Sequence, residues 1–147
     1  MPLRPVIAIA LAFACIASPQ AMAESLPNPR AASPAMSAAV AAGDAEAVAA
    51  LYLPEAILLG PGQPAVVGRA AIRAAWEQNF AAGFRSLSFS DIAAEQGTDR
   101  TAVLWTWAAE IAPAGQPAQV LKGRSLLYFT LTPVGWRISA DMWQPVP

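Results

Sequence analysis

Few side chains in this sequence of 147 residues can do acid–base or nucleophilic chemistry. The chain has no histidine and one cysteine, Cys15, which lies in a segment that we expect to be removed. This composition excludes Ser-His-Asp and Cys-His catalysis, and also zinc sites built from nitrogen and sulfur ligands. Acid–base chemistry must therefore depend on carboxylates, tyrosine or lysine, or on a cofactor. The glycine-containing turn at residues 60–64 is not a phosphate-binding loop, and we predict no cofactor and no metal.

Asp141 is the candidate catalytic residue. It is predicted to share one face of a sheet with Trp105 and Trp107. A carboxylate among apolar side chains must be paired, hydrogen-bonded or protonated, because desolvation disfavours its charge and raises its pKa. Such groups often mark functional sites. The alternative is that Asp141 is solvated near the end of its strand, or is tied to Arg137 or Arg73.

The orientation of Asp141 follows from the predicted pairing of three strands. If residues 113–117 and 133–135 form hairpin loops of five and three residues, the numbers of paired residues sum to about 230 and 268, so odd positions face odd positions. The odd face is the more apolar, and we assign it to the interior, with Arg137 at its rim. A shift of the register by one residue would reverse this assignment. The odd face collects Val103, Trp105, Trp107, Ala109, Ile111, Leu121, Gly123, Ser125, Leu127, Phe129, Leu131, Arg137, Ser139, Asp141 and Trp143.

The five tryptophans are typical of a cavity that stacks an apolar ligand, although large aromatic side chains also simply fill cores. Trp107 is predicted opposite Gly123 and Trp105 opposite Ser125, small partners that leave room for the indoles or for a ligand. The hydroxyl of Tyr52 needs a partner once it is buried, so it orients a ligand or satisfies a backbone group. The candidate ligand-binding residues are Tyr52, Leu58, Trp76, Phe80, Trp105, Trp107, Ser125, Leu127 and Trp143.

The elements that position these residues are predicted in an α+β order, with helices first and a meander last. Ser33 and Pro34 offer an N-cap and a first-turn proline, which predicts a helix from residue 33. Asp44 caps a second helical stretch that carries Tyr52. Apolar residues at intervals of four predict an amphipathic helix from residue 69 that ends at Gly83. Strands are predicted at 56–59 and 65–67, as a hairpin, and at 85–95, 101–112, 118–132 and 136–144.

The N-terminus has the features of a signal peptide. Arg4 gives a positive charge, residues 6–17 are twelve uninterrupted apolar residues, and Ala21 and Ala23 form a small-x-small cleavage site. Twelve residues make about 18 Å of helix, which is too short for the ~30 Å hydrocarbon core of a membrane. We expect a signal peptide at 1–23, a flexible lead-in at 24–32 and one domain at 33–147, exported to the periplasm or secreted. A lipoprotein acylated at Cys15 is the alternative.

Several short runs together resemble a known family over about residues 35–144. They are AGD at 42–44, LY at 51–52, GRAAI at 68–72 with Trp76, KGRS at 122–125, GWRI at 135–138 and DMW at 141–143. In order and spacing they resemble the SnoaL-like branch of the nuclear-transport-factor-2-like superfamily. The resemblance implies a cone-shaped α+β fold, with N-terminal helices packed on a curved, mainly antiparallel sheet that encloses an apolar pocket. The superfamily contains isomerases, dehydratases, cyclases, hydrolases and non-catalytic binders, so the fold alone does not imply a function.

Departures from the resembling enzymes narrow the function. Ketosteroid isomerases place a general-base aspartate before a proline, whereas here Gly60 precedes Pro61. Their catalytic tyrosine would fall near Met36, and related dehydratases use histidines. Cyclases of the SnoaL type use a late aspartate, for which Asp141 is the candidate.

Two functions remain open. The favoured one is an exported domain that binds a small apolar or aromatic molecule, with no assured catalysis, in which Asp141 and Tyr52 hydrogen-bond the polar end of the ligand. The alternative is a cofactor-free lyase, isomerase or cyclase with Asp141 as general acid/base and Tyr52 or Ser125 orienting a carbonyl.

Charge and surface patterning limit the partners. A net charge of −1 without any basic run argues against binding to nucleic acid. The family resemblance implies a homodimer through the outer face of the sheet. That face is predicted to present Leu104, Leu126, Tyr128, Ile138 and Met142 among polar side chains, a mixture that fits an interface and equally an exposed sheet.

Overall fold

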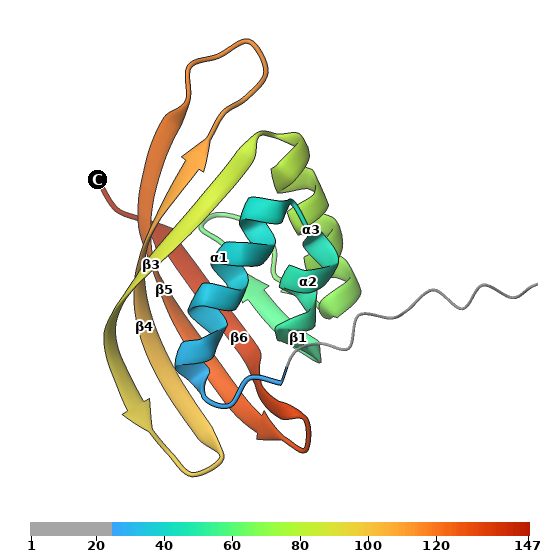
Figure 1. Cartoon of the computed structure of the whole chain (residues 1–147), viewed down its shortest axis with the longest axis vertical. Coiled ribbons are helices and arrows are strands. Elements are labelled where there is room, and N and C mark those ends of the chain that lie inside the picture. Colours follow the sequence, from blue (N-terminus) through green and yellow to red (C-terminus); the bar gives the residue numbers. More distant parts are fainter. Residues whose placement is uncertain (1–24) are drawn as a thin grey trace, which may run out of the picture.

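The computed structural model describes residues 25–147, except for the side chains of residues 91, 92 and 96. The predicted signal peptide at 1–23 lies outside the described residues. Three helices lie on one side of a long curved sheet (Figure 1), so the predicted α+β architecture is confirmed. The elements in chain order are η1 (Pro29–Ala31), α1 (Ala32–Ala42), α2 (Ala45–Ala50), β1 (Tyr52–Leu59), β2 (Val66–Val67), α3 (Arg69–Ala81), β3 (Phe84–Gln96), β4 (Arg100–Ile111), β5 (Gln119–Thr132) and β6 (Gly135–Pro145).

The sheet has six strands in the order β2-β1-β6-β5-β4-β3. All neighbours are antiparallel except β1 and β6, which run parallel. The short β1–β2 hairpin agrees with the sequence prediction, and Leu58 pairs with Val66 in it. Figure 1 shows the long strands β3, β4 and β5 bending around the helices, so the sheet has a concave inner face that the helices cover.

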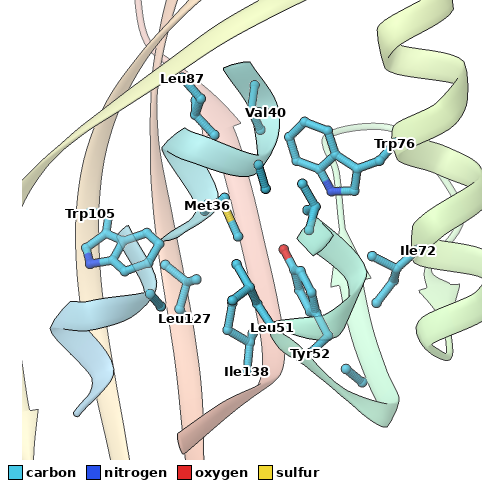
Figure 2. Packing of buried hydrophobic residues seen from close by; sticks show 14 of the residues in the cluster. Met36, Val40, Leu51, Tyr52, Ile72, Trp76, Leu87, Trp105, Leu127 and Ile138 are labelled. Atoms are coloured by element: carbon cyan, nitrogen blue, oxygen red, sulfur yellow. The ribbon is translucent and has the colours of Figure 1, made fainter. Parts of the chain in front are cut away.

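The hydrophobic core lies between the helices and this inner face. Figure 2 shows Met36 of α1 between Trp105 of β4 and Trp76 of α3. Leu127 and Ile138 of the two central strands are fully buried beneath the helices. Alternate residues of β4 and β5 point to opposite sides of the sheet, and burial in both strands alternates accordingly. The core therefore depends on the pairing register of these strands.

The predicted register between β4 and β5 is confirmed along the whole ladder. Trp107 pairs with Gly123 and Trp105 with Ser125, so the numbers of the paired residues sum to 230 as expected. Between β5 and β6, Ser125 pairs with Trp143 and Leu127 with Asp141, again as expected. Asp141 consequently belongs to the inner face.

The predicted register is wrong for the first part of β6. The turn between β5 and β6 has two residues and not three, since Thr132 pairs with Gly135. The register shifts by one residue between Tyr128 and Phe129, and a β-bulge at Ser139 absorbs the difference. The hydroxyl of Ser139 donates to the main-chain oxygen of Tyr128 at 2.8 Å.

This bulge reverses the two faces for residues 135–138. Ile138, predicted on the outer face, is fully buried opposite Phe129, and Trp136 is buried as well. Arg137, predicted at the rim of the inner face, is 3 % exposed and donates from Nη1 to the main-chain oxygen of Trp136 at 2.7 Å. Ser139, also predicted on the inner face, occupies the bulge. A one-residue difference in turn length is enough to exchange these positions.

The segment expected as a flexible lead-in packs against β6 where the structure describes it. Leu26 is 2 % exposed, and its carbonyl accepts from the amide of Trp136 at 3.0 Å. Gly135, with φ +99°, lets this segment approach β6 so closely that a Cβ there would lie 2.7 Å from Ser25 Oγ. Asn28 replaces Ser33 as the cap, because its side chain accepts from the amide of Ala31 and starts η1, which leads into α1.

Candidate functional site

A cavity of about 200 Å³ lies between the helices and the inner face of the sheet. Its lining is mainly apolar, and aromatic rings come from α3 and from the three strands β3, β4 and β6, which the curvature of the sheet brings around one space. Asp141 is its one carboxylate among the described residues. The lining residues are Met36, Leu58, Trp76, Asn79, Phe84, Leu87, Phe89, Trp105, Trp107, Ile111, Leu121, Ser125, Asp141 and Trp143.

The exposure of the cavity lining changes along the strands. Phe84 begins β3, Ile111 ends β4 and Leu121 lies near the start of β5, and all three are partly exposed. Asp141 and Trp105 are buried and lie further along the strands. We call this buried part of the lining, which holds the carboxylate, the inner end of the cavity.

The two oxygens of the Asp141 carboxylate have different surroundings. Oδ2 accepts a hydrogen bond from the Tyr52 hydroxyl at 2.9 Å. Oδ1 is buried and has no hydrogen-bond partner among the described residues. Burial raises the pKa of Asp141 to about 6, although the hydroxyls of Tyr52 and Ser125 lower it. The carboxyl can therefore lose and regain a proton near neutral pH, and Oδ1 is its oxygen without a hydrogen-bond partner among the described residues.

Tyr52 supports this carboxylate from the neighbouring strand. Burial and the charge of Asp141 raise the pKa of its phenol well above the usual value, so the hydroxyl stays protonated and donates. The prediction that Tyr52 continues a helix is wrong. Helix α2 ends at Ala50, because the chain turns to pair with β6, where the amide of Ile138 donates to the carbonyl of Leu51 at 2.9 Å. Pairing between strands outweighs the local helical pattern at this point.

Arg69 fixes the backbone of Tyr52. It begins α3, and its Nε donates to the carbonyl oxygen of Tyr52 at 3.0 Å while Nη2 donates to the same oxygen. The N–H groups of a guanidinium are fixed in one plane, so two of them can donate to the same carbonyl oxygen. The sequence showed Arg69 as part of a family-like run, but nothing in the run indicated this contact.

Small residues on β5 create the space for the indoles. The indole of Trp107 lies over Gly123, where an added Cβ would be 2.0 Å from Cζ2 of the ring. Trp107 Nε1 donates to the Ser125 hydroxyl at 3.1 Å. The predicted pairing of bulky indoles with small partners is confirmed, and the serine also anchors the ring through this hydrogen bond.

A second unpartnered polar atom lies in the cavity lining. Trp76 Nε1 is buried and, like Asp141 Oδ1, has no hydrogen-bond partner within residues 25–147. More than nine in ten buried polar groups in proteins are hydrogen-bonded. Two residues of the same cavity lining therefore each carry a buried polar atom without a partner among the described residues.

Most of the predicted site residues line the cavity. Those in its lining are Leu58, Trp76, Trp105, Trp107, Ser125, Asp141 and Trp143. Tyr52 does not line it and reaches the site through Asp141. Phe80 packs against Trp76, with the ring centroids 5.7 Å apart, and Leu127 is a fully buried core residue.

The other half of the cavity lining was not among the predicted site residues. The residues missed are Met36, Asn79, Phe84, Leu87, Phe89, Ile111 and Leu121. Leu87 and Phe89 alternate with serines at 86, 88 and 90, and this alternation indicated a half-buried strand whose apolar side chains belong inside. No comparable signal pointed to Asn79, which is polar and exposed on α3.

Within 25–147 there is no group of three or more His, Cys, Asp or Glu side chains that could hold a metal ion. None of the helices in this part of the chain is long and apolar enough to span a membrane.

Solved structures share this fold at low sequence identity. A ketosteroid isomerase-like protein from Erwinia carotovora atroseptica matches with a TM-score of 0.71 and 20 % identity, over 80 % of this chain and 93 % of that one. A nuclear transport factor 2-like superfamily protein from Salmonella enterica serovar Typhimurium matches with a TM-score of 0.68 and 14 % identity, over 79 % and 87 %. An NTF2-like protein with a cystatin-like fold from Novosphingobium aromaticivorans matches with 0.64 and 20 %, over 75 % and 74 %. At these identities the likeness shows the fold alone.

The sequence itself matches a family model. No protein of curated function is significantly similar to the chain. The model of the SnoaL-like domain matches residues 35–132, which is most of the described domain. The family match agrees with the cavity geometry and with the structural neighbours. The chain therefore belongs to the SnoaL-like domain family, within the nuclear-transport-factor-2-like superfamily.

Proposed function

We propose that this domain binds a small apolar or aromatic molecule in its cavity. The observation that carries the proposal is the buried Oδ1 of Asp141, an unpartnered acceptor at the inner end of an aromatic-lined space. An apolar cavity of about 150 Å³ is enough for benzene. A space of about 200 Å³ therefore suits one substituted ring or a small bicyclic compound.

A catalytic role is the second candidate. It is favoured by a buried carboxyl with a pKa of about 6, which suits a general acid/base at neutral pH. One such group contributes about 10² to 10⁴ in rate, which serves only a substrate that already reacts readily. Gly60, where the resembling ketosteroid isomerases have their base, lies against the indole of Trp143, and an added Cβ would be 3.1 Å from that ring. This supports binding over isomerisation.

Binding and catalysis can be separated in one set of measurements. Native mass spectrometry of the protein purified from its own host is expected to show a retained small molecule. That molecule, once identified, is then titrated against the wild type and Asp141→Asn and tested for turnover, with Glu110→Gln as a control that removes an exposed carboxylate. A binder returns the molecule unchanged. Turnover that Asp141→Asn abolishes without unfolding the protein would establish the enzyme. If no small molecule is retained, and none of a set of one-ring compounds quenches the tryptophan fluorescence, the binding proposal is wrong.

Export and dimerisation complete the proposal. The signal-peptide pattern supports export to the periplasm or secretion, and the mass of the mature chain from a periplasmic extract would test cleavage after Ala23. On the outer face, Leu126, Tyr128 and Met142 are 47 %, 41 % and 52 % exposed, which supports a homodimer through this face. Ile138 is not part of this surface, because it is buried. Light scattering of the purified protein, with Met142→Lys expected to give the monomer, tests the dimer.

A further inference from the structure

We infer that the ligand of this cavity is a cation, a protonated amine attached to one small apolar ring. The inference rests on the proposed binding function and adds the charge of the ligand to it. Two observations carry it. The buried carboxylate of Asp141 lies among aromatic rings and has one oxygen without a hydrogen-bond partner in the described residues. No lysine or arginine of the described residues lines the same cavity.

The carboxylate of Asp141 receives little compensation from the protein. Tyr52 from β1 donates a neutral hydrogen bond to Oδ2, and the neutral hydroxyl of Ser125 from β5 also lowers its pKa, but neither brings a positive charge. Arg69 donates to a carbonyl oxygen, and Arg73 forms its ion pairs on the exposed side of α3. A buried charge without a counter-charge is strongly unfavourable, and a positive ligand at Oδ1 would relieve this cost.

The aromatic lining suits an ammonium group as well as a ring. Trp143 and Asp141 are two residues apart on the same face of β6, a separation of about 7 Å along the strand. Trp143, Ser125 and Trp105 form one row across three neighbouring strands. The indoles of Trp107 and Trp143 meet edge to face, with centroids 6.0 Å apart. Indole faces attract cations within about 6 Å, most strongly where water is excluded.

The negative charge of Asp141 also disfavours anionic and neutral ligands. An anion would meet the carboxylate of Asp141, and the lining within the described residues offers it neither lysine nor arginine. A neutral alcohol can donate to Oδ1 but leaves the negative charge uncompensated. Since the pKa of Asp141 is about 6, this charge is present in the empty site at neutral pH. An ammonium donates a charge-assisted hydrogen bond to Oδ1, which is roughly twice as strong as a neutral one.

Three ring compounds of nearly equal size test the inference at pH 7.5. Benzylamine is the cation, benzyl alcohol its neutral counterpart and benzoate the anion, and each is titrated by calorimetry into the purified protein. Benzylamine is expected to bind at least tenfold more tightly than benzyl alcohol, and benzoate is expected not to bind. Asp141→Asn should weaken benzylamine at least tenfold and change benzyl alcohol less than threefold. Glu110→Gln, which removes an exposed carboxylate of equal charge, should leave all three affinities unchanged.

The outcomes separate the inference from the proposed function. Benzyl alcohol binding as tightly as benzylamine, or benzylamine unaffected by Asp141→Asn, would overturn the cationic ligand and leave a ring-binding cavity. If none of the three compounds binds to the wild type, the inference is overturned, and the proposed binding function falls with it when no small molecule is retained from the host either. A wild-type measurement does not depend on the folding of the variant. Lowering the pH from 7.5 to 5 protonates Asp141 and should weaken benzylamine several-fold, whereas an unchanged affinity would overturn the inference.

Discussion

The inner face of the sheet has two ends that differ in what they enclose. At the end near the β5–β6 turn, Phe129 and Ile138 are fully buried and pack into a closed core. At the other end, Ser125 lines the cavity, and the indole of Trp107 lies over Gly123 beside it. The same strands thus border a closed core at one end and a cavity at the other. The small residues of β5 at the cavity end leave room for the indole.

The largest expected effect distinguishes these ends by stability. Phe129→Ala should lower the free energy of unfolding by about 3–5 kcal/mol, because it opens a void in the closed core. Phe89→Ala should cost clearly less, since this half-buried ring already borders the cavity. Urea denaturation of both variants measures the difference. Equal losses of stability would mean that the two ends are packed alike.

A second prediction concerns the negative charge of Asp141, which is buried in the cavity lining. In the folded protein the pKa of Asp141 rises from 3.8 to about 6, so folding favours the protonated form. The stabilisation is fully present below pH 3.8 and is lost as the pH rises through 6, by about 1.4 kcal/mol for each pH unit and about 3 kcal/mol in total.

Asp141→Asn should abolish this pH dependence. Relative to the wild type, the variant should be stabilised by about 3 kcal/mol more at pH 7.5 than at pH 3.5, because only the wild type buries a charge at the higher pH. Chemical denaturation at both pH values measures the change, with the exposed Glu55→Gln as the control. If the stability difference between Asp141→Asn and the wild type stays constant with pH, the pKa of Asp141 is not raised by burial.

The third prediction concerns the glycine of β5 that makes room for an indole at the cavity end. In Gly123→Ala the new methyl group would collide with the indole of Trp107, and displacement of the ring should cost about 1–3 kcal/mol. The neighbouring Lys122→Ala, on the exposed side of the strand, should change stability by less than about 0.5 kcal/mol. Thermal denaturation and the tryptophan emission spectrum report both effects. An unchanged spectrum for Gly123→Ala would show that the indole has another position available.

The smallest effect concerns the open donor of the cavity. Trp76→Phe removes a buried N–H that has no partner among residues 25–147, so relief of that unpaired group offsets part of the lost packing, and we expect a cost below about 1 kcal/mol. Trp107→Phe removes an N–H that bonds to Ser125 and should cost more. Urea denaturation of the pair without ligand tests the order. The reverse order would indicate that Trp76 Nε1 has a partner, such as an ordered water.

The sequence predicted the fold and half of the residues that line the cavity. The register of β4 with β5 was predictable because apolar alternation and a single loop length agree there. The start of β6 was not, because a bulge leaves no mark in the local pattern. Tyr52 follows a helical pattern and yet joins a strand, since its pairing with β6 is a contact distant in sequence. Leu26 was missed for the same reason, as its burial depends on Gly135 more than a hundred residues later.

The contact of Arg69 gives α3 a mechanical role. Arg69 holds the backbone of Tyr52 at the first turn of this helix, and Trp76 enters the cavity from the same helix two turns later, about 10 Å away. One helix thus carries both a wall of the cavity and the clamp on the strand of the phenol, so the positions of Trp76 and Tyr52 depend on the same rigid element.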